Sequence, residues 1–415
     1  MAFFDFIRRP KPEAPAQPAV SLPEPYKFGT YQVELSKPEV PKIKESSKGK
    51  WIEYGEHNDY PEVLLSFLET SSLHNGITQG KSYLIAGNRV LIDGLPYEEW
   101  HDQSPADDAV KMALFLENLG DPLFDIKSNL ALDYTISGSF ALEIIWSMDF
   151  TRIAKINYVP WSRLRPEARD AEGKINHYYY SEDWTQYNRY FKKGQQEPLK
   201  IQAFDPYSKL QSGTPVPEDY PYQHTQILFV KNHWPGYDYF GRPVYQGALT
   251  DISADSKLSL FYLGAVENGF TPSVLITYTE PVASEEEARS IGKNIQKEFT
   301  IKGAGRKIMV LFANSPETAP KVEPLNVQNL DQQMIALQDQ LQNAIVTGHG
   351  VTSPELVGVT VPGQLGSGDL ELKWNIFYNN IIKKDRLVIE RVYNQLAKLN
   401  GITQKITFET INPLA

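Results

Sequence analysis

The chain of 415 residues contains no cysteine, so a disulfide framework, a thiolate zinc site and a cysteine nucleophile are all excluded. The absence of cysteine fits a reducing compartment. No apolar run approaches the roughly 20 residues that are needed to span a bilayer. The N-terminus, Met1 to Arg9, places its basic residues after a very short apolar run, which is the reverse of a secretion signal. We therefore expect a soluble, intracellular protein without a membrane segment, or one that belongs to an assembly made inside the cell.

Positive charge is also scarce. The 41 basic and 51 acidic residues give a net charge of -10, which argues against an electrostatic clamp for nucleic acid. No lysine or arginine stands between Lys321 and Lys373. The same stretch holds six acidic residues, namely Glu323, Asp331, Asp339, Glu355, Asp369 and Glu371. A surface that grips phosphates needs cations, so this stretch could instead line a conduit through which a polyanion slides without sticking.

The side chains that usually build metal or catalytic sites are not spaced for such sites. No two of the seven histidines lie three to five residues apart, and no cysteine could complete a zinc site. Ser139 and Ser367 lie outside any G-x-S-x-G motif. The acidic runs at Asp107 and Glu285 stand at predicted helix N-termini, where negative charge offsets the helix dipole. We predict no enzyme, no catalytic residue, no metal site and no cofactor.

One glycine-rich run leaves an alternative open. Gly363 to Gly368 precedes a predicted helix, and helix N-termini bind phosphates. The run lacks the P-loop lysine, and Asp369 and Glu371 would repel a nucleotide. Helix capping and flexibility are therefore the favoured roles. A phosphate-binding hydrolase or transferase that uses Gly363 to Asp369 stays as the alternative.

The first half of the chain predicts a mixed α+β domain behind a proline-rich arm. Asp59 or Asn58 can cap a helix that has Pro61 in its first turn. The further helices are expected from Ser72 to near Gly87, from Asp107, and over Leu123 to Tyr134. The expected strands are Phe140 to Trp146, Tyr178 to Tyr180, Tyr187 to Phe191, and Gln226 to Val230. Without interleaved cations, core or interface packing is favoured over base stacking for Trp146, Trp161 and Trp234.

The second half predicts two long helices on either side of a small α/β module. The first long helix is expected from Tyr245 to Asn268. The module then comprises a strand from Val274 to Tyr278, a helix capped by Ser284 and a strand from Lys307 to Phe312. The second long helix is expected from Asn329 to Thr347, and it is followed by a loop from Gly348 to Gly368 without structure of its own and a helix from Asp369 to about Leu399.

Three stretches carry a resemblance to a known family. Gly138 to Ile144, followed by Ile156 to Pro166, is similar to strands that end in a proline-containing turn. Gly247 to Leu275 contains Asn-Gly-Phe-Thr-Pro-Ser, and His349 to Gly358 is similar to a Gly-Val-Pro-Pro-x-Leu-Leu-Gly pattern. In this order and spacing they resemble the portal proteins of tailed double-stranded DNA bacteriophages, in the short subgroup with little crown.

The resemblance implies an α+β portal fold that is assembled head to tail into a ring of twelve subunits. The implied domains are an N-terminal arm (1–50), a wing (51–244), a first stem helix (245–272), a small α/β clip (273–326), a second stem helix (327–348), a tunnel loop (349–368), a long wing helix (369–400) and a short crown or C-terminal tail (401–415).

The resemblance also implies a function and partners. The ring would sit at one capsid vertex of the virion, after assembly in the host cytoplasm, and double-stranded DNA would enter and leave through its bore. Terminase large subunit, a neck or adaptor protein and the major capsid protein would be its partners, without a membrane. A cellular scaffold ring that makes only protein contacts is a further alternative.

Three groups of site residues follow from the resemblance. The tunnel loop at the DNA channel would be Val359, Thr360, Val361, Pro362, Gly363, Gln364 and Leu365. The channel-lining stem residues would be Gln332, Gln333 and Gln340. The clip residues that face terminase or adaptor would be Glu285, Glu286, Arg289, Lys293, Lys302 and Arg306. Uncharged loop and glutamine side chains would contact DNA without ion pairs, so each contact is easily broken.

Overall fold

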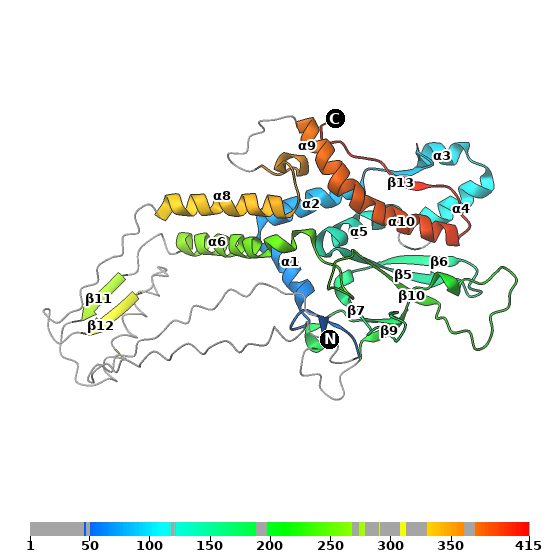
Figure 1. Cartoon of the computed structure of the whole chain (residues 1–415), viewed down its shortest axis with the longest axis horizontal. Coiled ribbons are helices and arrows are strands. Elements are labelled where there is room, and N and C mark those ends of the chain that lie inside the picture. Colours follow the sequence, from blue (N-terminus) through cyan, green and yellow to red (C-terminus); the bar gives the residue numbers. More distant parts are fainter. Residues whose placement is uncertain are drawn as a thin grey trace, which may run out of the picture. The chain divides into compact units, whose positions relative to one another are not determined.

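The computed structural model describes residues 45–46, 50–117, 120, 122–187, 197–267, 274–278, 290, 308–312, 330–360 and 370–414 (Figure 1). We call residues 50–248 and 370–414 the body, and helices α6 (Leu249–Glu267) and α8 (Leu330–Gly348) the helical pair. Within the described ranges, no helix combines the length and the hydropathy that a bilayer-spanning segment needs.

A six-stranded mixed sheet lies in the body. Its strand order is β6-β5-β10-β9-β8-β7, and only β9 and β10 run parallel to each other. The strands are β5 (Ser139–Trp146), β6 (Ile153–Val159), β7 (Leu164–Pro166), β8 (His177–Tyr180), β9 (Leu199–Ala203) and β10 (Thr225–Lys231). Six of the eight residues of β5 are buried, as expected of a central strand. The strands predicted at Phe140, Tyr178 and Gln226 are therefore confirmed.

Helices cover the sheet in two layers. Helix α5 (Leu123–Ser137) packs against β5 and β6, and helices α2 (Ser72–Ala86) and α10 (Lys383–Leu399) pack against α5. Because α5 lies between the sheet and these helices, ten of its fifteen residues are buried and it has no polar stripe. Helices α3 (Tyr97–Gln103) and α4 (Ala106–Glu117) complete this part, and Asp107 and Asp108 stand in the first turn of α4, as predicted.

The N-terminal helices begin where the capping chemistry predicts. Helix α1 (Tyr60–Thr70) has Asp59 at its N-cap and Pro61 in its first turn, and α2 ends at Gly87. The predicted start of folded structure at Trp51 is wrong by a few residues. Strand β1 (Glu45–Ser46) pairs with β2 (Glu53–Tyr54), and the Glu45 carboxylate accepts hydrogen bonds from three successive backbone amides, of Asp238, Tyr239 and Phe240.

The last long helix is continuous from Leu370 to Leu399, as predicted, but it is not regular throughout. Helix α9 (Leu370–Phe377) passes through a π-turn, η6 (Tyr378–Ile382), into α10. The turn falls just before the break that the sequence pattern has at Lys384 and Asp385. The helix ends before Gly401, which has a left-handed backbone with φ of 76°. Strand β13 (Ile406–Phe408) then pairs with β3 (Val90–Ile92), which also pairs with β4 (Leu95–Pro96).

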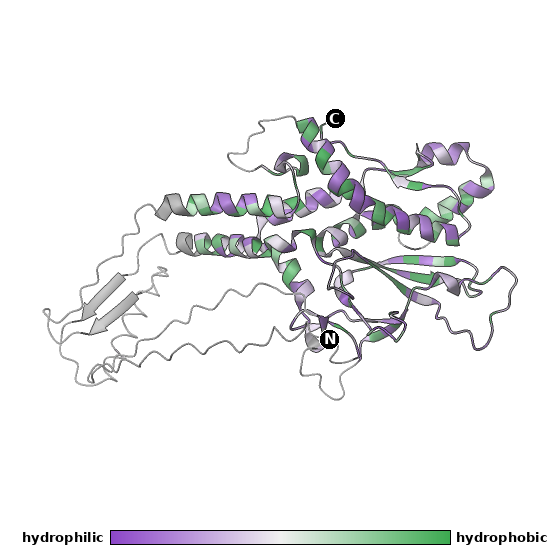
Figure 2. Cartoon of the chain, viewed as in Figure 1, coloured by the Kyte–Doolittle hydropathy of each residue, from purple (hydrophilic) through white to green (hydrophobic). Residues whose placement is uncertain are grey.

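The helical pair follows the sequence pattern closely. Helix α8 agrees with its prediction. The helix that was expected from Tyr245 starts as a 3-10 turn, η4 (Val244–Ala248), and α6 follows it from Leu249. Beyond the pair, β11 (Val274–Tyr278) and β12 (Ile308–Phe312) form a two-stranded parallel sheet, which confirms both predicted strands. Figure 2 shows hydrophilic and hydrophobic residues in mixture along α6 and α8.

Two further expectations differ from the structure at the residues that it describes. Tyr187 ends a 3-10 turn, η2 (Thr185–Tyr187), instead of starting a strand, because its ring packs with Trp51 and Trp184; residues 188–191 lie outside the described ranges. The loop after α8 is not without structure, since η5 (Pro354–Val357) is a 3-10 turn with three buried residues. Trp146 and Trp161 are buried in the core as predicted. Trp234 is 42% exposed, and the Arg242 guanidinium lies 4.5 Å from its ring centroid.

Candidate functional site

The helical pair leaves the body at one closely packed junction. Helices α6 and α8 lie side by side and antiparallel (Figure 1). The end of α8 meets the turn before α6 so closely that a Cβ added at Gly348 would overlap the Cβ of Ala248. Two hydrogen bonds fix α6 to the helix ends of the body. Ser71 Oγ donates to Asp255 Oδ2 at 2.6 Å, and Thr70 Oγ1 donates to Ser256 Oγ at 2.9 Å.

Burial falls along the helical pair with distance from the body. Near the junction, Leu249 and Ile252 of α6 and Ile345 of α8 are fully buried. Farther along, large apolar side chains are exposed: Leu260 (60%), Phe261 (55%), Leu263 (54%), Ile335 (59%) and Leu337 (45%). Contiguous exposed apolar side chains of this kind mark an interaction surface. On α8, Leu341 is buried, whereas Leu337, one turn farther from the body, is exposed.

Positive charge is almost absent from the helical pair. Lys257 is the one lysine or arginine in the sequence of α6, and α8 has none. Gln340 is exposed on α8. The side chains of Gln332 and Gln333 lie outside what the structure describes. The polar side chains of α8 are therefore amides, two carboxylates and one hydroxyl, without a cation that could bind a phosphate.

Helix α8 ends in a Schellman motif. The amide of Val351 donates to the carbonyl of Val346 at 3.2 Å, and the amide of Gly350 donates to that of Thr347 at 2.9 Å. Gly350 has the left-handed backbone that this motif requires, with φ of 69°. Val346 and Val351 are both buried and provide the apolar contact that accompanies the motif. The chain is thereby turned back onto α2.

Two histidines, 275 residues apart in the sequence, meet at this junction. Nδ1 of His74 lies 2.8 Å from Nε2 of His349, and both rings are buried. The Tyr245 ring stacks on His349 with its centroid 4.6 Å away. Burial, together with the nearby Lys81 ammonium, lowers the pKa of His74 to about 4 and lowers the pKa of His349 well below its usual value. Both imidazoles are therefore neutral at pH 7.

A buried lysine caps the same helix end. Lys81 of α2 is 2% exposed, and its Nζ donates to the His349 carbonyl at 3.0 Å. A cation at a helix C-terminus satisfies a free carbonyl and interacts favourably with the helix dipole. Burial lowers the pKa of Lys81 to about 8, while the carboxylate of the buried Asp385 acts in the opposite direction. Within the described ranges, no group of three His, Asp or Glu residues could hold a metal ion.

The start of the predicted tunnel loop is docked on α2 through two glycines. A Cβ at Gly80 would overlap the carbonyl oxygen of Val357, and one at Gly76 would lie 3.0 Å from Cγ2 of Val359. The amide of Gly358 donates to Glu355 and that of Val359 donates to Pro354, which closes a second turn around the left-handed Gly358. Small residues four apart on one helix face thus let η5 approach the helix backbone.

The predicted site residues are only partly placed. Val359 is half-buried and Thr360 is exposed at the end of the docked segment, where the description of the loop stops. Residues 361–369 lie outside the described ranges, and so do the loop positions Val361 to Leu365 and the glycine run Gly363 to Asp369. The clip positions Glu285, Glu286, Arg289, Lys293, Lys302 and Arg306 also lie outside them.

Sequence reasoning missed the polar part of the junction. His74 and Lys81 lie on α2, and no spacing in the sequence connects them with His349. The pairing exists only because α8 turns back onto α2. The spacing of Gly76 and Gly80 was a usable signal, since two glycines on one helix face allow close approach of another segment.

Comparisons with known proteins agree with this geometry. A stretch of 198 residues is 23% identical to the "Probable portal protein" of Haemophilus phage HP1 (strain HP1c1). The matched stretch covers 47% of this chain and 56% of that protein. The chain resembles phage portal proteins. It spans little more than half the length of this portal relative, and no family model matches it.

The fold itself has counterparts among solved structures. A chain in the virion of the native gene transfer agent (GTA) particle matches with a TM-score of 0.50 and 13% identity, over 84% of this chain and 83% of that chain. A chain in the neck of the empty GTA particle, computed with C6 symmetry, matches with a TM-score of 0.50 and 14% identity, over 84% of both chains. The α+β fold predicted from the portal resemblance is therefore confirmed.

Proposed function

We propose that this chain is one subunit of a portal ring, through whose bore double-stranded DNA passes during packaging and ejection. The observation that carries the proposal is the helical pair, which is long, anchored at one end, poor in cations and has large apolar side chains exposed along it. Those properties belong together in a ring, since a subunit needs neighbours on its flanks and a polyanion that moves past needs weak contacts. The similarity to a probable portal protein supports the same conclusion.

In this proposal the helical pair is the stem and the body is the wing. Leu260, Phe261 and Leu263 of α6, and Ile335 of α8, would be covered by adjacent subunits in a head-to-tail ring. A ring of twelve subunits would sit at a capsid vertex of the virion. The likeness in fold to a chain in a particle neck computed with C6 symmetry is compatible with such a ring.

The bore would be lined by α8 and by the tunnel loop that follows η5. Gln332, Gln333 and Gln340 would face the DNA from the stem, and Val359 to Leu365 would contact it from the loop. Because η5 is docked on Gly76 and Gly80, the loop would emerge from a fixed point of the wing. In this proposal the chain has a structural role and no catalytic one, and its contacts with the moving DNA are weak.

The remaining domains would serve assembly. Residues 273–326, which include β11 and β12, would form the clip, with its charged residues from Glu285 to Arg306 facing terminase and then the neck or adaptor protein. Residues 1–44 would be an arm, since Glu45 and Ser46 already pair with β2, and the residues that follow β13 would be a short crown or tail. The wing would contact the major capsid protein.

The mass of the purified protein in solution tests the proposal. Twelve copies of a 47.1 kDa chain give about 0.57 MDa by light scattering, and negative-stain images should show rings with a central opening. A protein that stays monomeric or dimeric at all concentrations, and whose images contain no rings, would contradict it.

A further inference from the structure

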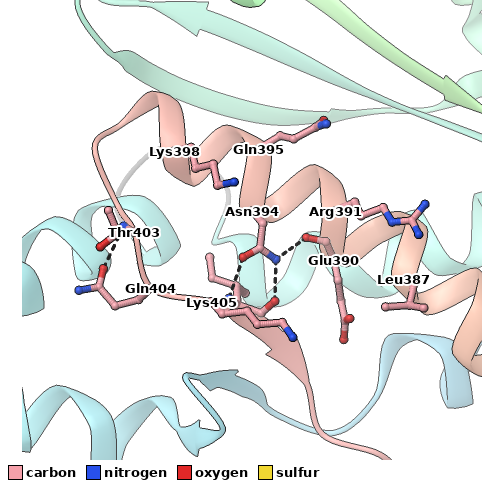
Figure 3. A pocket seen from close by; sticks show the side chains of 10 residues that line it. Leu387, Glu390, Arg391, Asn394, Gln395, Lys398, Thr403, Gln404 and Lys405 are labelled. Carbon is pink, nitrogen blue, oxygen red and sulfur yellow. Dashed lines mark hydrogen bonds between the residues drawn. The ribbon is translucent and has the colours of Figure 1, made fainter.

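A groove lies beside the last turns of α10, away from the helical pair (Figure 3). One wall is α10, and the other is the segment Thr403 to Ile406 that leads into β13. Asn394 holds the two walls together. Its Nδ2 donates to the Ile406 carbonyl at 2.7 Å, and its Oδ1 accepts from the Ile406 amide at 2.9 Å. The groove has a volume of about 490 Å³ and is therefore a built feature of the body.

Three cations line the groove. Arg391 and Lys398 extend from α10 and Lys405 from the opposite wall (Figure 3). All three residues are exposed, and none forms a salt bridge with any residue that the structure describes. Arg391 and Lys398 are seven residues apart, so they share one face and are separated by about 10 Å along the helix axis. In a chain with a net charge of -10, three cations thus gather in one place, and Lys405 lies near enough to the Glu390 carboxylate to oppose the rise in its pKa that burial causes.

The one acidic residue in the lining is already engaged. Glu390 is buried, and its Oε1 accepts a hydrogen bond from the amide of Phe408 at 2.8 Å. Gln404 is also engaged, since its Nε2 donates to Asp108 Oδ2 at 3.3 Å. The cations, together with Gln395 and Thr403, therefore remain for a ligand.

The lining favours a polyanion over a second copy of the chain. The centre of a protein interface is apolar and depleted in lysine. Here the lining contains two lysines and an arginine, and its apolar surface comes from Leu387, the buried Ile406 and the aliphatic stems of the polar side chains. Arginine, lysine, threonine and glutamine are the side chains that contact phosphate oxygens of DNA. The 10 Å between Arg391 and Lys398 corresponds to the axial rise of about three phosphates along one strand.

We propose that this groove binds the sugar-phosphate backbone of double-stranded DNA, independently of sequence. The choice of DNA as the polyanion rests on the proposed function. The chain then has two surfaces that act on the same ligand in opposite ways. The helical pair lets DNA slide because it has a single cation, Lys257, and the groove retains DNA because three cations line it.

The test compares two triple variants of the full chain. One is Arg391→Gln with Lys398→Gln and Lys405→Gln. The matched control is Arg152→Gln with Lys155→Gln and Lys383→Gln, which removes the same charge from exposed positions of the body outside the groove lining. Binding to a fluorescein-labelled 20-bp duplex of mixed sequence is measured by anisotropy from 50 to 200 mM salt. We expect the groove variant to bind about 10- to 100-fold more weakly at 50 mM salt, and its salt slope to be smaller by about 2 to 3. The control variant should bind as the unaltered protein does.

Equal loss in both triple variants would overturn the proposal, because binding would then reflect total charge. So would unchanged binding in the groove variant, or the absence of DNA binding by the unaltered protein. A groove variant with normal DNA binding but a smaller mass by light scattering would assign the groove to contacts between copies. Unaltered protein that stays monomeric yet binds DNA through the groove would contradict the ring and leave the groove proposal standing.

Discussion

The body and the helical pair both contain long helices, but the two regions differ in how the carbonyl groups at the helix ends and the apolar side chains are covered. In the body, the C-terminus of α2 is wrapped by two buried cations. Lys127 donates to the carbonyls of Ala86, Gly87 and Asn88, and Arg386 donates to those of Leu84 and Ile85. In the helical pair, as far as the structure describes it, such a cap is found at the end of α8 that enters the body, where Lys81 donates to the His349 carbonyl. Farther out, apolar side chains are exposed and cations are nearly absent.

This difference separates stability from assembly. The body contains its own core and buries its positive charge where helix ends need it, so it should fold without neighbours. The helical pair keeps its apolar side chains for other subunits and its polar side for a passing ligand. Substitutions should therefore act on unfolding in the body and on assembly or transport in the helical pair.

The largest effect on stability is expected for Arg386→Met. The substitution removes a nearly fully buried guanidinium and leaves the carbonyls of Leu84, Ile85 and Phe408 without their donor. We expect a loss of about 3 to 5 kcal/mol in the free energy of unfolding, measured with urea. The matched change at an exposed cation of the helical pair, Lys257→Met, should cost less than about 0.5 kcal/mol. Similar costs at the two positions would remove the contrast between body and pair.

The next largest effect is expected at the junction, for Gly80→Ala. The added methyl group would overlap the Val357 carbonyl, so η5 must move off α2. We expect a loss of about 1 to 3 kcal/mol and faster amide exchange at residues 354–359. Gly247→Ala is the control, since a Cβ there has nothing within 4 Å. Unchanged exchange at Gly358 and Val359 in the Gly80 variant would show that the segment is not held by α2.

The histidine pair makes the junction sensitive to acid. The unfolded chain protonates His74 near pH 6.5, whereas the folded chain does so only near pH 4, so stability falls as the pH drops through this window and levels off below it. At pH 5 the loss from His74 is about 2 kcal/mol, and His349 acts in the same direction. Burial raises the pKa of Asp133 to about 8, which has the opposite sign.

The contribution of the pair is therefore measured as a difference. We compare urea unfolding at pH 7 and pH 5 for the unaltered protein and for the double variant His74→Gln with His349→Gln. The unaltered protein should lose about 2 kcal/mol more than the variant. Equal losses would mean that the pair does not titrate in this window.

The smallest effect on stability, and the clearest one on transport, is expected in the tunnel loop. Thr360→Arg and Gln364→Lys each add a cation where DNA is proposed to slide, and Thr360 is exposed. The free energy of unfolding should change by less than about 0.5 kcal/mol, and rings should be unchanged by light scattering. Packaging or ejection should slow, because each cation adds a phosphate contact. Normal packaging rates would refute the low-friction interpretation.

Local chemistry explains what could be predicted from the sequence. The start of α1 at Asp59 and Pro61, and the strands β11 and β12, depend on neighbouring residues and were found to within a residue or two. The strand expected at Tyr187 was wrong because the distant ring of Trp51 packs there. The histidine pair depends on contacts across most of the chain, so no local pattern contains it. The domain boundaries and the tunnel-loop, stem and clip assignments remain predictions.

The π-turn at Tyr378–Ile382 inserts one extra residue into the long C-terminal helix, compared with a regular α-helix. Trp374 and Phe377 before the turn and Ile389 and Val392 after it all reach the core, so the extra residue is absorbed inside the turn. Deleting exposed Asn379 or Asn380 would leave a regular helix with both flanks in their present orientation. The same deletion two turns later would rotate the rest of the helix by about 100° and expose its apolar stripe. The long helix can therefore lose one residue at the π-turn without a rotation of the segments on either side of it.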